Sequence, residues 1–211
     1  MTALSASAAL FAGHVGPNAV SQLGAALLAG WGAEAAHRVY ARAGELAWLE
    51  RPPAAMVPQE RVARLHAALR EELPRPQALE AARDAGERTA RYLLANRIPR
   101  PAQLLMRWLP GFLAARMLLA MIRRNAWTFA GSGRIVTRAP DRRTGRGWIE
   151  IHDNPLAANP CTWHEGVFTT LFASLAAPTA RVIETQCGAG QPGSCCHFEI
   201  ALVPEQAESP H

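Results

Sequence analysis

The chain has 211 residues, 49% of them hydrophobic and 18% charged, which is typical of a folded domain that buries a core without disulfides. All 22 basic residues are arginines, and the formal net charge is +5. These arginines are spread from Arg38 to Arg181 instead of forming the run that follows a phosphate backbone, so we expect no nucleic-acid partner.

Residues 1–30 are apolar but lack the basic start of a secretory signal, so we expect a cytoplasmic protein. The apolar segment Leu104–Ile122 approaches membrane-spanning length, yet Arg107, Pro110 and Arg116 fall inside it. We therefore expect a buried or membrane-touching helix there. A peripheral contact with the inner face of the membrane stays open.

The first half of the chain alternates helical patterns with prolines. Apolar residues recur at helical spacing in 58–73, and prolines or glycines delimit the other segments. We predict helices over 18–40, bent at Gly30 and Gly32, and over 58–73, 77–96 and 101–124.

From residue 127 onward the pattern is typical of strands. We predict strands over 127–138 and 148–152, a helix from Asn159-Pro160 to about Leu175, and strands over 180–186 and 195–203. The expected fold class is α+β, with N-terminal helices packed on a small antiparallel sheet. The C-terminal half of the chain, which forms this sheet, is expected to have the order β-β-α-β-β.

The stretch ETQCGAGQPGSCCHF, residues 184–198, allows two interpretations. Gly188, Gly190 and Gly193 spell the GxGxxG of a dinucleotide-binding loop, but that loop needs a helix after the third glycine, and a strand pattern follows here. We therefore interpret the glycines as a hairpin turn and expect no NAD(P) or FAD site.

The cysteines of this stretch suggest a metal site. A hairpin brings Cys187 and Cys195 together, Glu184 lies three residues before Cys187, and Cys161 opens the preceding helix, where the helix dipole favours a thiolate. Three thiolates and one carboxylate would close a tetrahedral shell around a structural zinc. Small buried cysteines are the alternative, and spacing alone does not decide between them.

These residues carry a resemblance to a known family. Cys161-x-Trp163, Glu184-x-x-Cys187 and Cys195 resemble the vinyl-reductase-type small-molecule-binding domain, which also serves as the sensor of phenol-responsive activators. The stretches at 92–99, 124–133 and 161–172 are similar to the bacteriochlorophyll 4-vinyl reductase family, BchJ. The resemblance implies zinc held by Cys161, Glu184, Cys187 and Cys195.

The resemblance also implies a domain organisation. It suggests an N-terminal helical extension over 1–57, a vinyl-reductase-type ligand-binding domain over 58–205 and a flexible tail over 206–211. The family name implies reduction of a vinyl group on a magnesium tetrapyrrole of the protochlorophyllide or chlorophyllide type.

Zinc has no redox chemistry, and a closed Cys3Glu shell leaves only Cys196, too few thiolates for an iron–sulfur cluster. We therefore favour a protein that binds the tetrapyrrole and delivers it to, or assists, the vinyl-reduction step. A reductase in its own right and a small-molecule sensor are the alternatives. Bacteriochlorophyll biosynthesis enzymes are the expected partners, and a homodimer stays open.

A pigment site needs a wide apolar slot, a cation for a propionate and a donor for magnesium. We expect this slot between the helix over 101–124 and the sheet. The candidates come from the most apolar helix, the segment after it and the helix that begins near Cys161. Each of them also fits an ordinary structural role, in the core or, for the arginine, at a solvated helix end. They are Trp108, Phe112, Met117, Met121, Arg124, Trp127, Phe129 and His164.

Overall fold

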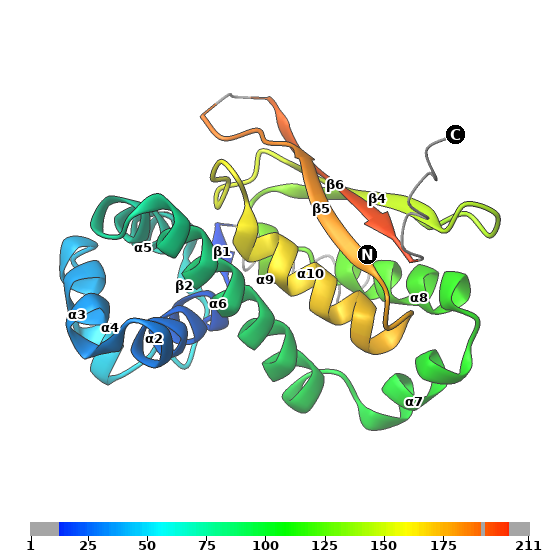
Figure 1. Cartoon of the computed structure of the whole chain (residues 1–211), viewed down its shortest axis with the longest axis horizontal. Coiled ribbons are helices and arrows are strands. Elements are labelled where there is room, and N and C mark those ends of the chain that lie inside the picture. Colours follow the sequence, from blue (N-terminus) through cyan, green and yellow to red (C-terminus); the bar gives the residue numbers. More distant parts are fainter. Residues whose placement is uncertain (1–12, 191–192, 203–211) are drawn as a thin grey trace, which may run out of the picture.

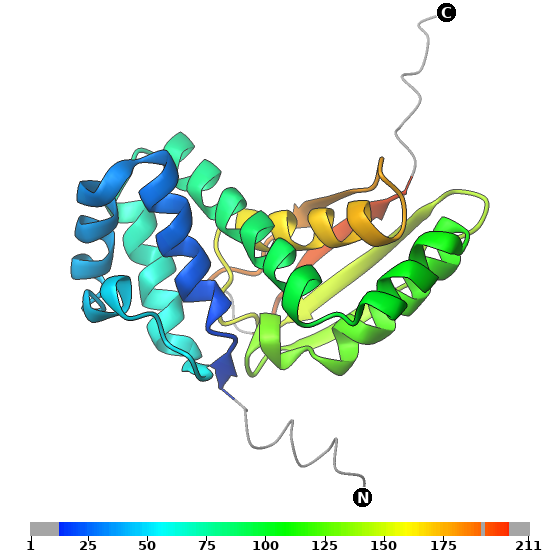
Figure 2. The same ribbon diagram turned by 90° about the horizontal axis from the view of Figure 1, so that it is seen from below.

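The computed structural model describes residues 13–190 and 193–202. Helices from the first half of the chain gather at one end of the molecule, and a four-stranded sheet lies at the other (Figure 1). Two long helices, α6 and α10, run between these parts, as both views show (Figure 2). The α+β fold class expected from the sequence is confirmed.

The helical end is formed by the segments before residue 73. A short pair of strands, β1 (His14–Val15) and β2 (Val57–Pro58), joins the segment before α2 to the segment before α5. Its helices are α2 (Asn18–Gly30), α3 (Gly32–Arg42), α4 (Ala47–Glu50) and α5 (Gln59–Glu72). The expected helix over 18–40 is therefore two helices, because the chain turns at Trp31 and Gly32 adopts a φ of +81°.

Four further helices lead to the sheet: α6 (Arg75–Asn96), α7 (Arg100–Trp108), α8 (Gly111–Arg124) and α9 (Trp127–Ala130). We expected one helix over 101–124, but Leu109 is extended because it precedes Pro110, and this separates α7 from α8. The strand expected over 127–138 is also wrong in its first half, which forms α9. Gly131, at a φ of +53°, ends that helix.

The sheet has the order β3-β4-β6-β5, and its pairs are antiparallel. The strands are β3 (Arg134–Arg138), β4 (Arg146–His152), β5 (Arg181–Gln186) and β6 (Cys195–Ala201), and α10 (Thr162–Leu175) connects β4 to β5. Buried side chains alternate along β6 at Cys196, Phe198 and Ile200. The β-β-α-β-β order of this half agrees with the sequence prediction.

Helix α10 packs between the sheet and α6 at a close helix crossing. Gly86 of α6 faces the backbone of Trp163, and Gly166 of α10 faces the backbone of Arg83. A Cβ atom at either glycine would collide with the opposite helix backbone. The crossing therefore depends on two residues without side chains, and it fixes the start of α10 against α6.

The expected domain boundary near residue 57 stays a prediction. The helices on either side of it pack together, and α2 lies along α6. The expected tail at 206–211 lies outside the described residues. Within the described residues, no helix is both long and apolar enough to cross a membrane.

Candidate metal centre and apolar pocket

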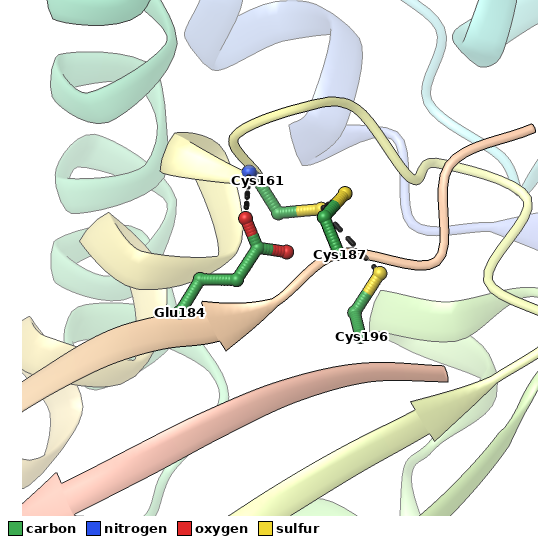
Figure 3. A group of neighbouring side chains, drawn as sticks. All are labelled: Cys161, Glu184, Cys187 and Cys196. Atoms are coloured by element: carbon green, nitrogen blue, oxygen red, sulfur yellow. Dashed lines mark hydrogen bonds between the residues drawn. The ribbon is translucent and has the colours of Figure 1, made fainter. Parts of the chain in front are cut away.

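Three cysteines and one glutamate meet where the start of α10 touches the ends of β5 and β6 (Figure 3). Cys161 is the N-cap of α10, Glu184 belongs to β5, Cys187 follows β5 and Cys196 lies in β6. Their ligand atoms all lie within 4.8 Å of one another. Residues from distant parts of the sequence thus form one compact set of metal-ligand types.

The sulfur atoms are spaced as zinc ligands would be. Cys161 Sγ lies 3.6 Å from Cys196 Sγ and 3.8 Å from Cys187 Sγ, and all four cysteines of the chain are free. A disulfide would need about 2.05 Å. Tetrahedral zinc with Zn–S bonds of about 2.3 Å separates its sulfurs by about 3.8 Å. The donor set and its spacing therefore fit a tetrahedral Cys3Glu zinc site.

One oxygen of the Glu184 carboxylate accepts a hydrogen bond, and the other faces no donor among the described residues. Its Oε2 accepts the backbone N–H of Cys161 at 2.7 Å. Its Oε1 is buried and has no hydrogen-bond partner among the described residues. A buried carboxylate oxygen without a partner is costly, and a cation would satisfy it.

The cluster already favours one thiolate. The Cys161 thiol and the N–H groups of Gly188 and Asn154 stabilise the charged form of Cys196 and lower its pKa to about 6, although burial opposes this. The hydrogen bond to Cys196 and burial raise the pKa of Cys161. Burial also raises the pKa of Cys187. A bound divalent cation would favour the thiolate form of all three.

The structure differs from the sequence expectation at the fourth ligand, because Cys196 rather than Cys195 joins the cluster. Successive residues of a strand point to opposite faces of a sheet. Cys196 pairs with Ile151 and is fully buried, whereas Cys195 pairs with His152 and is half-buried on the other face. Burial, followed by the nearby Glu150, raises the pKa of Cys195. The resemblance matched a spacing, and spacing does not determine which face a cysteine occupies.

An ion pair that the sequence interpretation missed, Arg83–Glu165, positions the backbone of Glu184. Glu165 of α10 is buried; its Oε1 accepts the backbone N–H of Glu184 at 2.8 Å. Its Oε2 accepts from Arg83 of α6 at 2.5 Å. The α6–α10 crossing is thus connected to the metal centre through Glu165.

Arg70 of α5 also lies near the cluster. Burial lowers the pKa of its guanidinium, while the Cys161 and Cys187 sulfurs act in the opposite direction. Its Nη1 donates to His66 O at 2.7 Å, and its Nε is buried without a partner among the described residues. No local pattern indicates that this arginine lies near the cluster, because Arg70 and the cysteines are far apart in the chain.

A separate apolar pocket of about 350 Å³ lies among the helices, in the part of the structure where α2, α6, α8, α9 and α10 meet. We expected a pocket between the helix over 101–124 and the sheet, but helices form this one. Its lining residues are Gly16, Pro17, Asn18, Met56, Leu93, Arg97, Ile98, Leu118, Met121, Ile122, Asn125, Trp127, Thr128, Phe129 and Leu171.

Three of the eight residues expected to bind the ligand line this pocket: Met121, Trp127 and Phe129. The other five lie elsewhere. Trp108 is 86% exposed on α7, Arg124 is exposed at the end of α8, and Phe112 and Met117 pack half-buried against the core. His164 is buried in α10, where its Nε2 lies 3.2 Å from Phe129 O. The single apolar helix that grouped most of these residues in the sequence is broken at Pro110, which turns Trp108 and Phe112 away from the pocket.

The polar residues of the pocket were missed by the sequence interpretation. Arg97 follows the end of α6, Asn18 begins α2, and Asn125 follows α8. The side-chain nitrogen of Asn125 donates to Met121 O at 2.9 Å. These residues come from three separate segments, so only the tertiary structure brings them to one site.

No protein-family model matches the chain. Solved structures share its fold at low sequence identity. One, concerned with modulating heme redox potential through protein-induced porphyrin distortion, has a TM-score of 0.51 and 12% identity, and the match covers 86% of this chain and 97% of that one. Another, concerned with the mechanism of H-NOX activation, has a TM-score of 0.51 and 13% identity and covers 86% and 93%. At such identity these matches show the fold alone.

Sequence relatives are much more similar. The chain is 42% identical over 198 residues to the bacteriochlorophyll synthase 23 kDa chain of Cereibacter sphaeroides, covering 89% of this chain and 90% of that protein. It is 38% identical over 188 residues to the chain of the same name from Rhodobacter capsulatus, covering 86% and 84%. The resemblance to a bacteriochlorophyll family is therefore confirmed, and the protein belongs to the family of the bacteriochlorophyll synthase 23 kDa chain.

Proposed function

We propose that this protein acts in bacteriochlorophyll biosynthesis by binding a magnesium tetrapyrrole of the protochlorophyllide or chlorophyllide type. It then delivers this intermediate to, or assists, the enzyme that reduces the vinyl group. The observation that carries the proposal is the name of the relatives, bacteriochlorophyll synthase 23 kDa chain, at 42% and 38% identity over most of the chain. Other bacteriochlorophyll biosynthesis proteins are accordingly the proposed partners.

The apolar pocket supports the tetrapyrrole part of the proposal. Its volume of about 350 Å³ lies in the range of small-molecule sites, about 300–1,000 Å³. Trp127 and Phe129 offer aromatic surface for a planar ring. The Arg97 guanidinium suits a propionate carboxylate, and the amide oxygens of Asn18 and Asn125 are of the hard type that Mg²⁺ prefers.

The fold gives a second line of support. One solved structure of this fold concerns porphyrin distortion induced by its protein, so in that protein the fold accommodates a tetrapyrrole. An apolar pigment free in water aggregates, because exposing its apolar surface costs free energy. A protein that shields the pigment from water and releases it to an enzyme would prevent this aggregation.

We also propose that Cys161, Glu184, Cys187 and Cys196 hold a structural zinc. Support comes from sulfur separations that match a tetrahedron, from the buried Oε1 of Glu184 and from the lowered pKa of Cys196. Zinc in such a closed shell supplies folding free energy and not electron transfer. Here it would join the start of α10 to β5 and β6.

A reductase in its own right is the alternative function. The glycine loop connects β5 directly to the strand β6, so it does not provide the helix N-terminus that binds a pyrophosphate in dinucleotide folds. This geometry favours a carrier over an enzyme with its own nicotinamide site. A small-molecule sensor is the second alternative, and it would bind a ligand without delivering it. A homodimer stays a prediction.

The test is an absorption titration with four pigments: divinyl and monovinyl protochlorophyllide and chlorophyllide. The carrier predicts a shifted and sharpened Soret band on binding, with no loss of the vinyl group when NADPH is added. Vinyl reduction by the purified chain with NADPH would establish the reductase instead. An unchanged spectrum with all four pigments would contradict both.

A further inference from the structure

One segment of the chain has a strongly one-sided charge. Between Tyr92 and Pro140 there is no Asp or Glu, although the whole chain carries 17 acidic residues. Eight arginines fall in the same segment: Arg97, Arg100, Arg107, Arg116, Arg123, Arg124, Arg134 and Arg138. In the described part of the chain, none of these eight forms an ion pair with a carboxylate. The segment is therefore a locally cationic surface on a protein of modest net charge.

Helix α7 presents a row of large apolar side chains within this cationic segment. Trp108 is 86% exposed, Leu104 55% and Leu105 52%, whereas Met106 is fully buried and anchors the helix to the core. Arg100, Leu104 and Trp108 follow one another at intervals of four residues and so share one face of the helix. We call Arg100, Leu104, Leu105, Arg107 and Trp108 the α7 surface.

Ordinary packing does not explain the α7 surface. Figure 1 places α7 at the edge of the molecule, where α8 and α10 contact it from the inner side. An exposed Trp beside two exposed Leu is costly in water, and such a group marks an interaction site. The flanking arginines indicate that the partner is anionic.

A lipid bilayer fits both features. Helices that lie in the plane of a membrane combine Trp and Leu on one face with Arg or Lys beside them, and Trp is favoured at the headgroup level. The helix has nine residues, too short to span a bilayer, and no described helix could do so. Lying on the surface is the geometry that α7 can adopt.

The pocket lies next to this surface along the chain. Arg97 and Ile98 line the pocket and immediately precede α7, and Met121 and Asn125 come from α8, which packs against α7. The segments that line the pocket thus adjoin α7 at both of its ends, which places the docking surface and the pocket in the same part of the chain.

We propose that the α7 surface docks on an anionic lipid bilayer. Trp108, Leu104 and Leu105 insert at the headgroup level, and Arg100 and Arg107 pair with lipid phosphates. The docking itself needs no pigment. Its use for exchanging a pigment between membrane and pocket rests on the proposed function.

Co-sedimentation of the pigment-free protein with vesicles tests the docking. One set of vesicles contains phosphatidylcholine alone, and the other contains equal parts of phosphatidylcholine and phosphatidylglycerol. The wild-type protein should bind the anionic vesicles strongly at low salt, less at high salt, and the neutral vesicles weakly. The double variant Leu104→Ser/Trp108→Ser should bind the anionic vesicles at least about tenfold more weakly, because the apolar contact is lost.

Matched control variants test whether vesicle binding depends on the α7 surface and not on other exposed residues. Ile183 is 58% exposed on β5, so Ile183→Ser removes a similarly exposed apolar residue and should bind like the wild type. Arg100→Gln should weaken binding about fivefold, and Arg51→Gln, which removes an exposed charge at the helical end, should not.

Two results would overturn the proposal: equal binding by the double variant and the wild type, or no preference for anionic vesicles. A wild-type dimer in lipid-free sedimentation that Leu104→Ser/Trp108→Ser dissociates would overturn it too, because a second copy would then cover the α7 surface. Pigment binding in detergent solution is measured separately. It should be unchanged in the double variant, so a failure of docking is distinguishable from a failure of the proposed function.

Discussion

The sulfur atoms of Cys161 and Cys196 lie 3.6 Å apart, although 35 positions separate the two residues in sequence. One begins a helix and the other lies on the buried face of β6, one of the two inner strands of the sheet. Their contact fixes how α10 sits on the sheet. It also creates a site where a thiolate is favoured, as the pKa of about 6 at Cys196 shows.

The adjacent cysteines provide a matched pair of variants. Cys196→Ser should lose most of the bound zinc and lower the stability of the fold, because it removes a ligand from the closed shell. Removing a residue that only hydrogen-bonds to a metal ligand lowers the affinity for the metal about 10–100-fold, so removing a ligand itself should lower it further. Cys195→Ser should keep one zinc per chain, because its side chain lies on the other face of the sheet.

Elemental analysis of both variants, purified with a thiol reductant and without added chelator, measures this directly. Zinc retained by Cys196→Ser and lost from Cys195→Ser would show that the spacing of the resemblance, and not this geometry, identifies the ligand. The absence of metal from the wild-type protein would reject the zinc proposal altogether.

Gly86→Ala should destabilise the protein by about 1–3 kcal/mol, because the new methyl group collides with the backbone of Trp163 and forces α6 and α10 apart. Gly30→Ala is the control, since no atom lies within 4 Å of the added Cβ in α2. That change should be neutral or stabilising by up to about 1 kcal/mol. Urea unfolding of both variants gives their free energies of unfolding. Equal changes in the two variants would contradict the close contact between α6 and α10.

Acid should destabilise the protein through two buried histidines. Burial lowers the pKa of His66 and of His164 to about 4. Because an unfolded histidine has a pKa of about 6.5, only the unfolded state gains these protons as the pH falls from about 6.5 to 4. The stability present above pH 6.5 is thus lost in that window, by about 3 kcal/mol per histidine.

The double variant His66→Gln/His164→Gln should show a shallower loss of stability than the wild type between pH 6.5 and 4. Glutamine keeps a donor for the carbonyls of Ala19 and Phe129, which the two rings face. Unfolding measured at several pH values gives the slope of each protein, and the comparison removes contributions common to both, including metal release. Identical dependence of stability on pH in the two proteins would contradict the role of His66 and His164 in acid destabilisation.

Local patterns explain why much of the fold was predictable from the sequence. Apolar residues at helical spacing identified α5, and prolines bounded α6. Alternation identified β5 and β6 within one or two residues of their ends. These features depend on neighbouring residues. The break at Leu109 and the short helix α9 were missed because a strongly apolar segment obscured the effects of Pro110 and Gly131.

The candidate sites were predictable only in part. Cys161, Glu184 and Cys187 follow from residue type and spacing, but the choice of Cys196 over Cys195 depends on strand register. Glu165 and Arg70 act through tertiary contacts that no local pattern encodes. The pocket takes its polar residues from three separate segments, so sequence reasoning found only its apolar wall.

Binding of a magnesium tetrapyrrole in the pocket lined by Met121 is the core of the proposed function. The most direct measurement is the dissociation constant for protochlorophyllide, from absorption titrations of the wild type, Met121→Lys and Met117→Lys. Met117 lies on the same helix outside the pocket lining, so it controls for adding a charge to α8. Met121→Lys should weaken binding at least about tenfold, because a cation in an apolar slot is costly, while Met117→Lys should bind nearly as the wild type does. Equal affinities for all three proteins, or no binding by the wild type, would contradict this proposal.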